Sequence, residues 1–187
     1  MKSKIEHAGS IELSGKVIAS DPCYERKTWC MAEDISIKPG KYNAFIVKED
    51  EKDFGIRVSS IIIVHSEYMI SANSKWVPYP ATIGVDSGQC GIFDDNIYPV
   101  DGSDQGEWND NNSFYGECCA LTLSDKHGGI LRSQKGFVSS SGYGDGSYEL
   151  FSVINNMERV ALMLDFDLVN RRKVMKQLMK GNGGKNG

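Results

Sequence analysis

Four short segments of the sequence combine an acidic residue with glycine, serine or tyrosine at positions where strands are expected to end. They are ASDPCY (19–24), GVDSGQCGIFDD (84–95), SSSGYGDGSY (139–148) and LDFDL (164–168). Aspartate beside proline or glycine is common in turns, where its carboxylate accepts hydrogen bonds from nearby backbone amides. Taken singly, each segment is therefore explained by turn formation alone.

Taken together, the four segments predict a shared polar site. In a β-sandwich or a barrel, loops that are distant in sequence converge at one end of the structure. We therefore predict a site for a small polar ligand or a protein partner. Its predicted residues are Asp21, Asp86, Gly88, Gln89, Ser141, Gly142, Asp145, Gly146 and Tyr148.

Three of these residues are also candidate metal ligands. Calcium prefers carboxylate, hydroxyl and carbonyl oxygens in a flexible arrangement. The predicted ligands are Asp21, Asp86 and Asp145, and a divalent cation is the cofactor that these residues suggest. The Asp-rich segment 100–116 lacks the residue order of an EF-hand, which excludes that motif and leaves an irregular ion site open.

A second interpretation assigns the carboxylates to catalysis. Two carboxylates at a suitable separation can act as general acid and base, or as metal ligands, in a hydrolase. The candidates for this role are Asp21, Asp86, Asp145 and Asp165. Nucleophilic catalysis has less support, because no G-x-S-x-G or Walker A motif occurs and a His65–Cys90 pair lacks the context of a known cysteine protease. Whether the protein is an enzyme stays open at this point.

Apolar residues alternate along most of the chain, which predicts strands. Residues 147–154 and 159–168 predict a hairpin turned at Asn155 and Asn156, which tolerate left-handed backbone conformations. A second hairpin is predicted from residues 41–50 and 54–69, and the second of its strands is apolar on both faces, as expected of a central strand. Further strands are expected at residues 16–20, 82–86, 90–93, 117–123 and 136–140.

These elements predict a mainly β protein: a single-domain β-sandwich or barrel of antiparallel strands with a short C-terminal helix. The domain is predicted to span residues 1–169. Residues 170–187 are predicted to form a basic helix, within residues 171–180, and a disordered tail. The polar segment 100–116 is expected to be a long loop, mobile unless a ligand or an ion holds it.

Charge and cysteine content narrow the compartment and the partners. Residues 170–187 hold six of the 21 basic residues and no acid, which leaves 15 basic against 25 acidic residues in the rest of the chain. Binding to nucleic acid is therefore expected only through the basic tail, which is a third candidate for the working part. Five cysteines without a secretion signal or membrane segment predict reduced thiols and a cytoplasmic protein that does not contact membranes.

The order of the motifs carries a family resemblance. SDP (20–22), VDSGQ (85–89) followed by IFD (92–94), GYGDGSY (142–148) and ALMLDF (161–166) appear in turn. This order resembles the bacterial and phage proteins of domain-of-unknown-function family 4241, over residues 15–168, with Tyr143 in place of the more usual tryptophan. The resemblance implies one domain and a shared site that includes Asp21, Asp86, Gly88, Gln89, Asp145 and Tyr148. It is compatible with mobile-element cargo, toxin-associated modules or counter-defence proteins.

Overall fold

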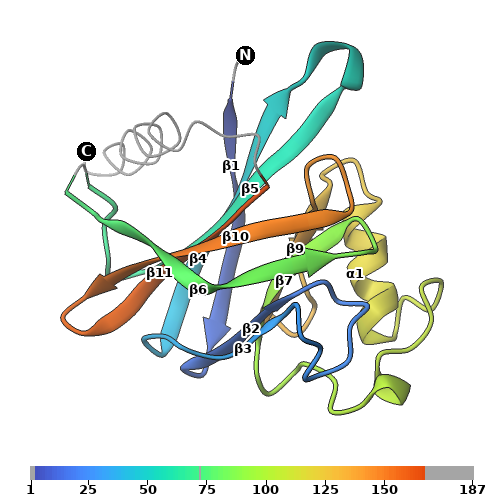
Figure 1. Ribbon diagram of the computed structural model, residues 1–187, viewed down its shortest axis with the longest axis horizontal. Coiled ribbons are helices and arrows are strands. Elements are labelled where there is room, and N and C mark those ends of the chain that lie inside the picture. The colour runs from blue at the N-terminus through green and yellow to red at the C-terminus, as the bar shows by residue number, and fades with distance from the viewer. Residues whose placement is uncertain (1–2, 72, 167–187) are drawn as a thin grey trace.

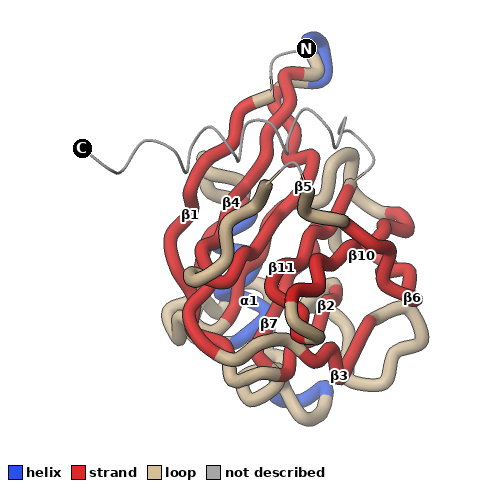
Figure 2. The backbone as a smooth tube through the Cα atoms, turned by 90° about the vertical axis from the view of Figure 1, so that its left-hand side faces the viewer, coloured by secondary structure: helices blue, strands red, loops and turns tan. Residues whose placement is uncertain are grey.

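The computed structural model describes residues 3–71 and 73–166, and most of them lie in two antiparallel sheets (Figure 1). The six-stranded sheet contains, in spatial order, β1 (Lys4–Leu13), β4 (Gly40–Asp50), β5 (Ile56–His65), β11 (Glu158–Asp165), β10 (Gly146–Asn155) and β6 (Trp76–Val85). In Figure 2 these strands follow one another across the molecule in this order. The five-stranded sheet contains β3 (Ala32–Ser36), β2 (Lys16–Ser20), β7 (Gln89–Asp94), β9 (Gly136–Ser140) and β8 (Gly128–Ile130).

The main hydrophobic core lies between the two sheets. Val17, Ile92 and Phe137 from the five-stranded sheet pack in one cluster with Ile61 and Leu164 from the six-stranded sheet, and all five are fully buried. Sheet-on-sheet packing of this kind removes a large apolar area from water. The prediction of a mainly β single domain is confirmed.

Both predicted hairpins are present. Strands β4 and β5 are joined through the short 3-10 helix η1 (Lys52–Phe54), and β5 is apolar on both faces, with Ile61 in the main core and Ile62 in a second cluster on the outer face. Strands β10 and β11 are joined by a two-residue turn at Asn156 and Met157, whose φ angles are 50° and 66°. Positive φ at both central residues matches the twist of a hairpin. The turn lies one residue later than predicted.

The strand predicted at residues 117–123 is wrong, because these residues belong to helix α1 (Phe114–Thr122). Ser113 caps the helix, and its side chain accepts a hydrogen bond from the Gly116 amide at 3.1 Å. Cys118 packs in a cluster with Val138 on the outer face of the five-stranded sheet, beside β8 and β9. A short apolar run fits a buried strand as well as a buried helix, so periodicity alone could not distinguish them.

Other predictions are settled only in part. The predicted loop 100–116 contains the 3-10 helix η2 (Gly102–Asp104) and the start of α1, while the predicted C-terminal helix and basic tail lie outside the described residues. All five cysteines are free thiols. Within residues 3–71 and 73–166, no helix is long and apolar enough to cross a membrane.

Candidate functional site

Asp21 follows strand β2 and joins two of the predicted segments. Its buried carboxylate accepts hydrogen bonds from the Cys23 amide at 2.9 Å, the Asp86 amide at 2.9 Å and the Ser87 amide at 2.7 Å. The Ser87 hydroxyl donates a fourth bond at 2.6 Å. A carboxylate with four donors around it is fully engaged, so Asp21 fixes the β6–β7 turn against the end of β2.

The β6–β7 turn in turn contacts the glycine-rich loop after β9. The Ser141 amide donates to the Gly88 carbonyl at 3.0 Å. Gly88 has a φ of 69°, and a Cβ atom at this position would lie 3.9 Å from the Cα of Gly144. The two turns therefore pack backbone against backbone, which the small residues of both motifs allow.

Two side chains close the glycine-rich loop from within. The Ser141 hydroxyl and the Tyr148 hydroxyl both donate to the Gly144 carbonyl, at 2.9 Å and 2.7 Å. The Gly142 amide donates to the Val58 carbonyl at 3.0 Å and attaches the loop to β5. These residues shape the loop, whose exposed side chains are Asp145 and Tyr143, and the Tyr143 hydroxyl donates to the Glu51 carboxylate at 2.9 Å.

Asp86 and Asp145 are exposed neighbours at the surface of this assembly. Gly146 of β10 is paired with Val85 of β6, so Asp145 and Asp86 are the next residues on the two antiparallel strands. Tyr24 lies beside Asp86, and burial followed by the hydrogen bond to Asp86 raises the pKa of Tyr24 above its ordinary value. We call the surface formed by residues 21–24, 86–88 and 141–146 the rim.

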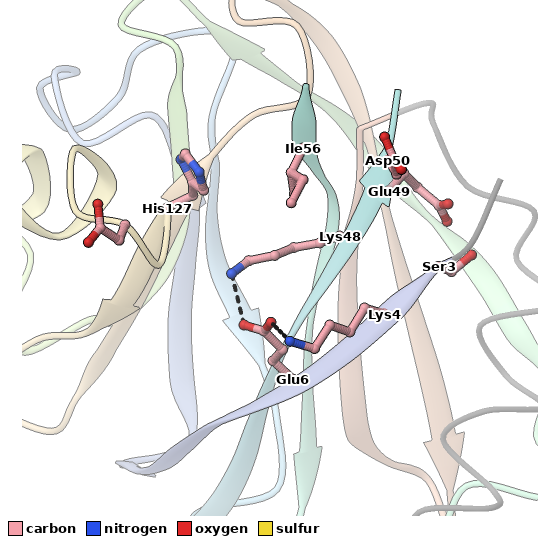
Figure 3. A pocket seen from close by; sticks show the side chains of 9 residues that line it. Ser3, Lys4, Glu6, Lys48, Glu49, Asp50, Ile56 and His127 are labelled. Atoms are coloured by element: carbon pink, nitrogen blue, oxygen red, sulfur yellow. Dashed lines mark hydrogen bonds and ion pairs between the residues drawn. The ribbon is translucent and has the colours of Figure 1, made fainter. Parts of the chain in front are cut away.

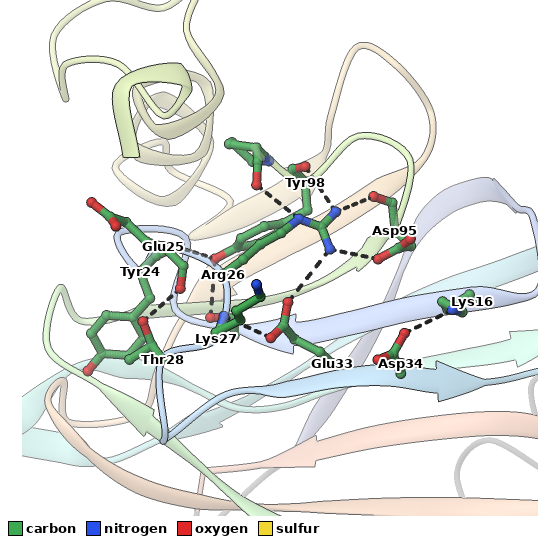
Figure 4. Close-up of polar contacts among 12 residues, drawn as sticks. Lys16, Tyr24, Glu25, Arg26, Lys27, Thr28, Glu33, Asp34, Asp95 and Tyr98 are labelled. Carbon is green, nitrogen blue, oxygen red and sulfur yellow. Dashed lines mark hydrogen bonds and ion pairs between the residues drawn. The ribbon is translucent and has the colours of Figure 1, made fainter. Parts of the chain in front are cut away.

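The loop that carries Tyr24 is held by an arginine clamp (Figure 4). The Arg26 guanidinium donates to the Asp95 carboxylate at 2.8 Å, the Asp95 carbonyl at 2.6 Å and the Pro99 carbonyl at 3.1 Å. The Gln105 side chain also donates to the Tyr24 carbonyl. These contacts tie the loop after β2 to the segment after β7 and so restrain the rim on this side.

The three carboxylates predicted as metal ligands do not form a metal site. Within residues 3–71 and 73–166, no group of three or more His, Cys, Asp or Glu side chains is placed to hold a metal ion. The physical reason lies in Asp21, whose oxygens are occupied by amide and hydroxyl donors, and this leaves only Asp86 and Asp145 at the surface. The divalent cation expected at these three residues therefore stays a prediction that this geometry does not support.

Gln89 also differs from its predicted role. Its buried side chain donates to the Cys119 sulfur at 3.3 Å and accepts from the Thr122 hydroxyl at 3.2 Å. Gln89 therefore connects the β6–β7 turn to helix α1 and faces away from the solvent. Of the other predicted residues, Gly146 begins β10 at the rim.

Sequence reasoning missed side chains that border the rim. Tyr24 and Ser87 lie inside the predicted segments 19–24 and 84–95, and their hydroxyl groups could have marked them as site residues. Tyr115 of α1 lies next to Ser87 and Cys119, and burial followed by Cys119 raises its pKa to about 12. The sequence did not indicate that Tyr115 borders the rim, because residues 117–123, which follow it, were expected to form a strand and not a helix.

The Cys23 thiol at the rim is held in its protonated form. Burial, followed by the nearby charge of Asp21, raises the pKa of Cys23 well above its ordinary value. Because the thiolate is the reactive species, we expect iodoacetamide at pH 8 to modify Cys23 at least about tenfold more slowly in the native protein than in urea. Peptide mass spectrometry measures both rates, and equal rates would contradict the assignment.

Comparisons with known proteins leave this site without a counterpart. The sequence matches no protein-family model, no curated protein and no solved structure. The resemblance to domain-of-unknown-function family 4241 therefore stays a prediction, and the function must be argued from the geometry.

Proposed function

We propose that the protein is a binding module whose rim recognises a cationic group, such as the guanidinium or ammonium of a small polar ligand or a protein partner. One observation carries the proposal: Asp86 and Asp145 are both exposed and each is the next residue beyond the paired Val85 and Gly146, on a surface whose backbone is held by Asp21, Ser141 and Tyr148. Carboxylates carried on a fixed backbone lose less conformational entropy on binding a cation than carboxylates on a mobile loop. A guanidinium pairs with carboxylates through strong, charge-assisted hydrogen bonds.

The geometry favours binding over the alternative of a carboxylate-dependent hydrolase. Asp21, one of the predicted acid–base residues, is buried and engaged by four donors, so it has no free oxygen for a substrate. Asp165, the fourth candidate, is also buried in β11, which leaves the exposed Asp86 and Asp145 as the accessible carboxylates of this set. The protonated Cys23 thiol is likewise a poor nucleophile.

Binding can be tested with arginine as the probe and citrulline as its uncharged analogue. We expect arginine to shift the NMR amide signals of Gly144 and Ser87, and citrulline to bind about tenfold more weakly, because it lacks the charge that the carboxylates recognise. The double variant Asp86→Asn, Asp145→Asn should lose about tenfold in arginine affinity with little change in melting temperature, since both side chains are exposed and an asparagine at position 86 can still accept the hydrogen bond from Tyr24.

The matched control is Asp53→Asn, which neutralises an exposed aspartate in η1 and should leave arginine binding unchanged. Equal binding of arginine by the double variant and the parent protein would refute the proposal. A screen of phosphoester, glycoside and nucleotide substrates tests the alternative. If the protein turns over one of these substrates and Asp145→Ala abolishes that turnover, the protein is a hydrolase and the proposed binding module is refuted.

The setting in which the module acts is also a proposal. The five free thiols support a reducing, cytoplasmic location. The motif order shared with bacterial and phage proteins of family 4241 supports an origin in a phage or another mobile element. Fractionation of the native host cell would test the location.

A further inference from the structure

A second hollow lies away from the rim, where the open edges of the two sheets approach each other (Figure 3). Strands β1 and β4 form one side, and the segment 124–130, which leads from α1 into β8, forms the other. It consists of two adjoining cavities of about 500 Å³ and 650 Å³ that share Glu6 and Asp125 in their lining. Each has the size of a small-molecule site. We call the pair the edge cavity.

The backbone is irregular on both sides of the edge cavity. The pairing of β1 with β4 shifts register between His7 and Gly9, and the pairing of β4 with β5 shifts between Val47 and Lys48. Such bulges redirect side chains and are common beside functional sites. On the opposite side, His127 has a φ of 57°, a left-handed conformation that few non-glycine residues adopt. Lys48 and His127, which stand at two of these irregular positions, both line the cavity.

Lys48 is the residue whose chemistry defines the cavity. It is only 9% exposed, although its side chain ends in a charged ammonium. Within residues 3–71 and 73–166, the ammonium makes one hydrogen bond, to a Glu6 carboxylate oxygen at 2.8 Å. An ammonium carries three donors, and buried donors without acceptors are costly. Two donors of Lys48 are therefore available to an acceptor inside the cavity.

The acidic neighbour of Lys48 does not cancel its charge. Glu6 also pairs with Lys4 at 2.8 Å, and the hydrogen bonds from Lys4 and Lys48 lower the pKa of Glu6. The group of Lys4, Glu6 and Lys48 thus carries a net charge of +1. Figure 3 shows this group on one side of the cavity and His127 on the other. Glu49, Asp50 and Asp125 also belong to the lining. Asp50 and Asp125 are exposed, and in Figure 3 the side chains of Glu49 and Asp50 extend from β4 on the side away from the Lys48 side chain.

The larger of the two cavities has a partly apolar lining. Ala8 and Ile46 line it from the six-stranded sheet, and Leu121 and Ile130 line it from α1 and β8. Apolar walls next to a few well-placed polar groups are typical of small-molecule sites. A ligand that satisfies both parts needs an anionic head and an aliphatic body.

We propose that the edge cavity binds a small amphiphilic carboxylate, whose head accepts hydrogen bonds from Lys48 and whose aliphatic body lies along Ile46, Leu121 and Ile130. This site is separate from the rim and does not depend on the function proposed for it. Addition of a peptide strand to the open edge of β1 is disfavoured, because the bulge at His7 and Gly9 interrupts the regular row of backbone groups that such pairing needs.

Four probes on the unmodified protein test the proposal by NMR titration: hexanoate, hexan-1-ol, hexylamine and acetate. We expect hexanoate to shift the amide signals of Gly128 and Gly129 and to bind about tenfold more tightly than the other three, because only hexanoate has both the charge and the chain. Equal binding of hexan-1-ol, tighter binding of hexylamine, or no shift with hexanoate would each overturn the proposal.

Variants then assign the contact to Lys48. Lys48→Met should lower hexanoate affinity about tenfold, because it removes the ammonium and keeps the chain length, while Lys48→Arg should retain most of the affinity. The control is Lys41→Met, which removes an exposed charge elsewhere on β4. Undiminished hexanoate binding by a folded Lys48→Met protein would refute the assignment. If this variant does not fold, the four-probe comparison still decides.

Discussion

Replacing Asp21 by alanine is expected to lower the free energy of unfolding by about 3–5 kcal/mol, because several buried donors lose a charged acceptor at once. The carboxylate accepts hydrogen bonds from the amides of Cys23, Asp86 and Ser87 and from the hydroxyl of Ser87. Urea unfolding followed by circular dichroism measures the change.

Two further variants make the Asp21 prediction specific. Asp21→Asn keeps the shape but presents an NH2 group to amide donors, so it should retain only part of the stability, with a loss of about 2 kcal/mol. Asp53→Ala, at an exposed aspartate, should change stability by less than about 0.5 kcal/mol. An Asp21→Ala protein as stable as the Asp53→Ala control would show that Asp21 does not hold the rim together.

Replacing Phe166 by alanine is expected to lower the free energy of unfolding by about 3–5 kcal/mol, the usual cost of removing a buried phenylalanine. Phe166 is 1% exposed and packs edge-on against Tyr148, with ring centroids 5.1 Å apart. Tyr148 closes the glycine-rich loop through its bond to the Gly144 carbonyl. The variant should therefore also loosen the rim, which faster hydrogen exchange of the Gly144 amide would report.

A double-mutant cycle separates this contact from general loss of packing. Phe166→Ala and Tyr148→Ala should be coupled by about 0.5–1.5 kcal/mol, as edge-to-face aromatic pairs usually are. Tyr143→Ala serves as the control, since this ring lies in the same loop but is exposed. If the losses of unfolding free energy in Phe166→Ala and Tyr148→Ala are additive, Phe166 does not support the rim through Tyr148.

Alternating apolar residues made the strands predictable, and one helix shows where this signal fails. Residues 159–166 alternate because Leu162, Leu164 and Phe166 pack into the core between the sheets, so the hairpin with β10 could be predicted. Helix α1 could not be predicted, because its nine residues bury two adjacent cysteines and are too few to show a helical period clearly. Strand β1 was also missed, since most of it is only partly buried.

The candidate site was predictable in its segments and not in its roles. Aspartate and glycine at strand ends indicated that residues 21, 86 and 145 belong together, and the structure brings their loops into contact. Residue types alone did not distinguish a buried anchor from an exposed ligand, however. Asp21 and Asp86 have the same side chain, yet one accepts four hydrogen bonds in the interior and the other lies at the surface.

The sequence by itself determined the strand-rich fold, the main hairpins and the reduced state expected of the thiols, because these depend on local periodicity, turn chemistry and composition. Only the tertiary structure decided which carboxylate is engaged, that Gln89 faces α1, and that Lys48 and His127 line one cavity. The reason is physical. Burial and hydrogen-bond partners come from residues far apart in the chain, and only packing of the two sheets brings them together.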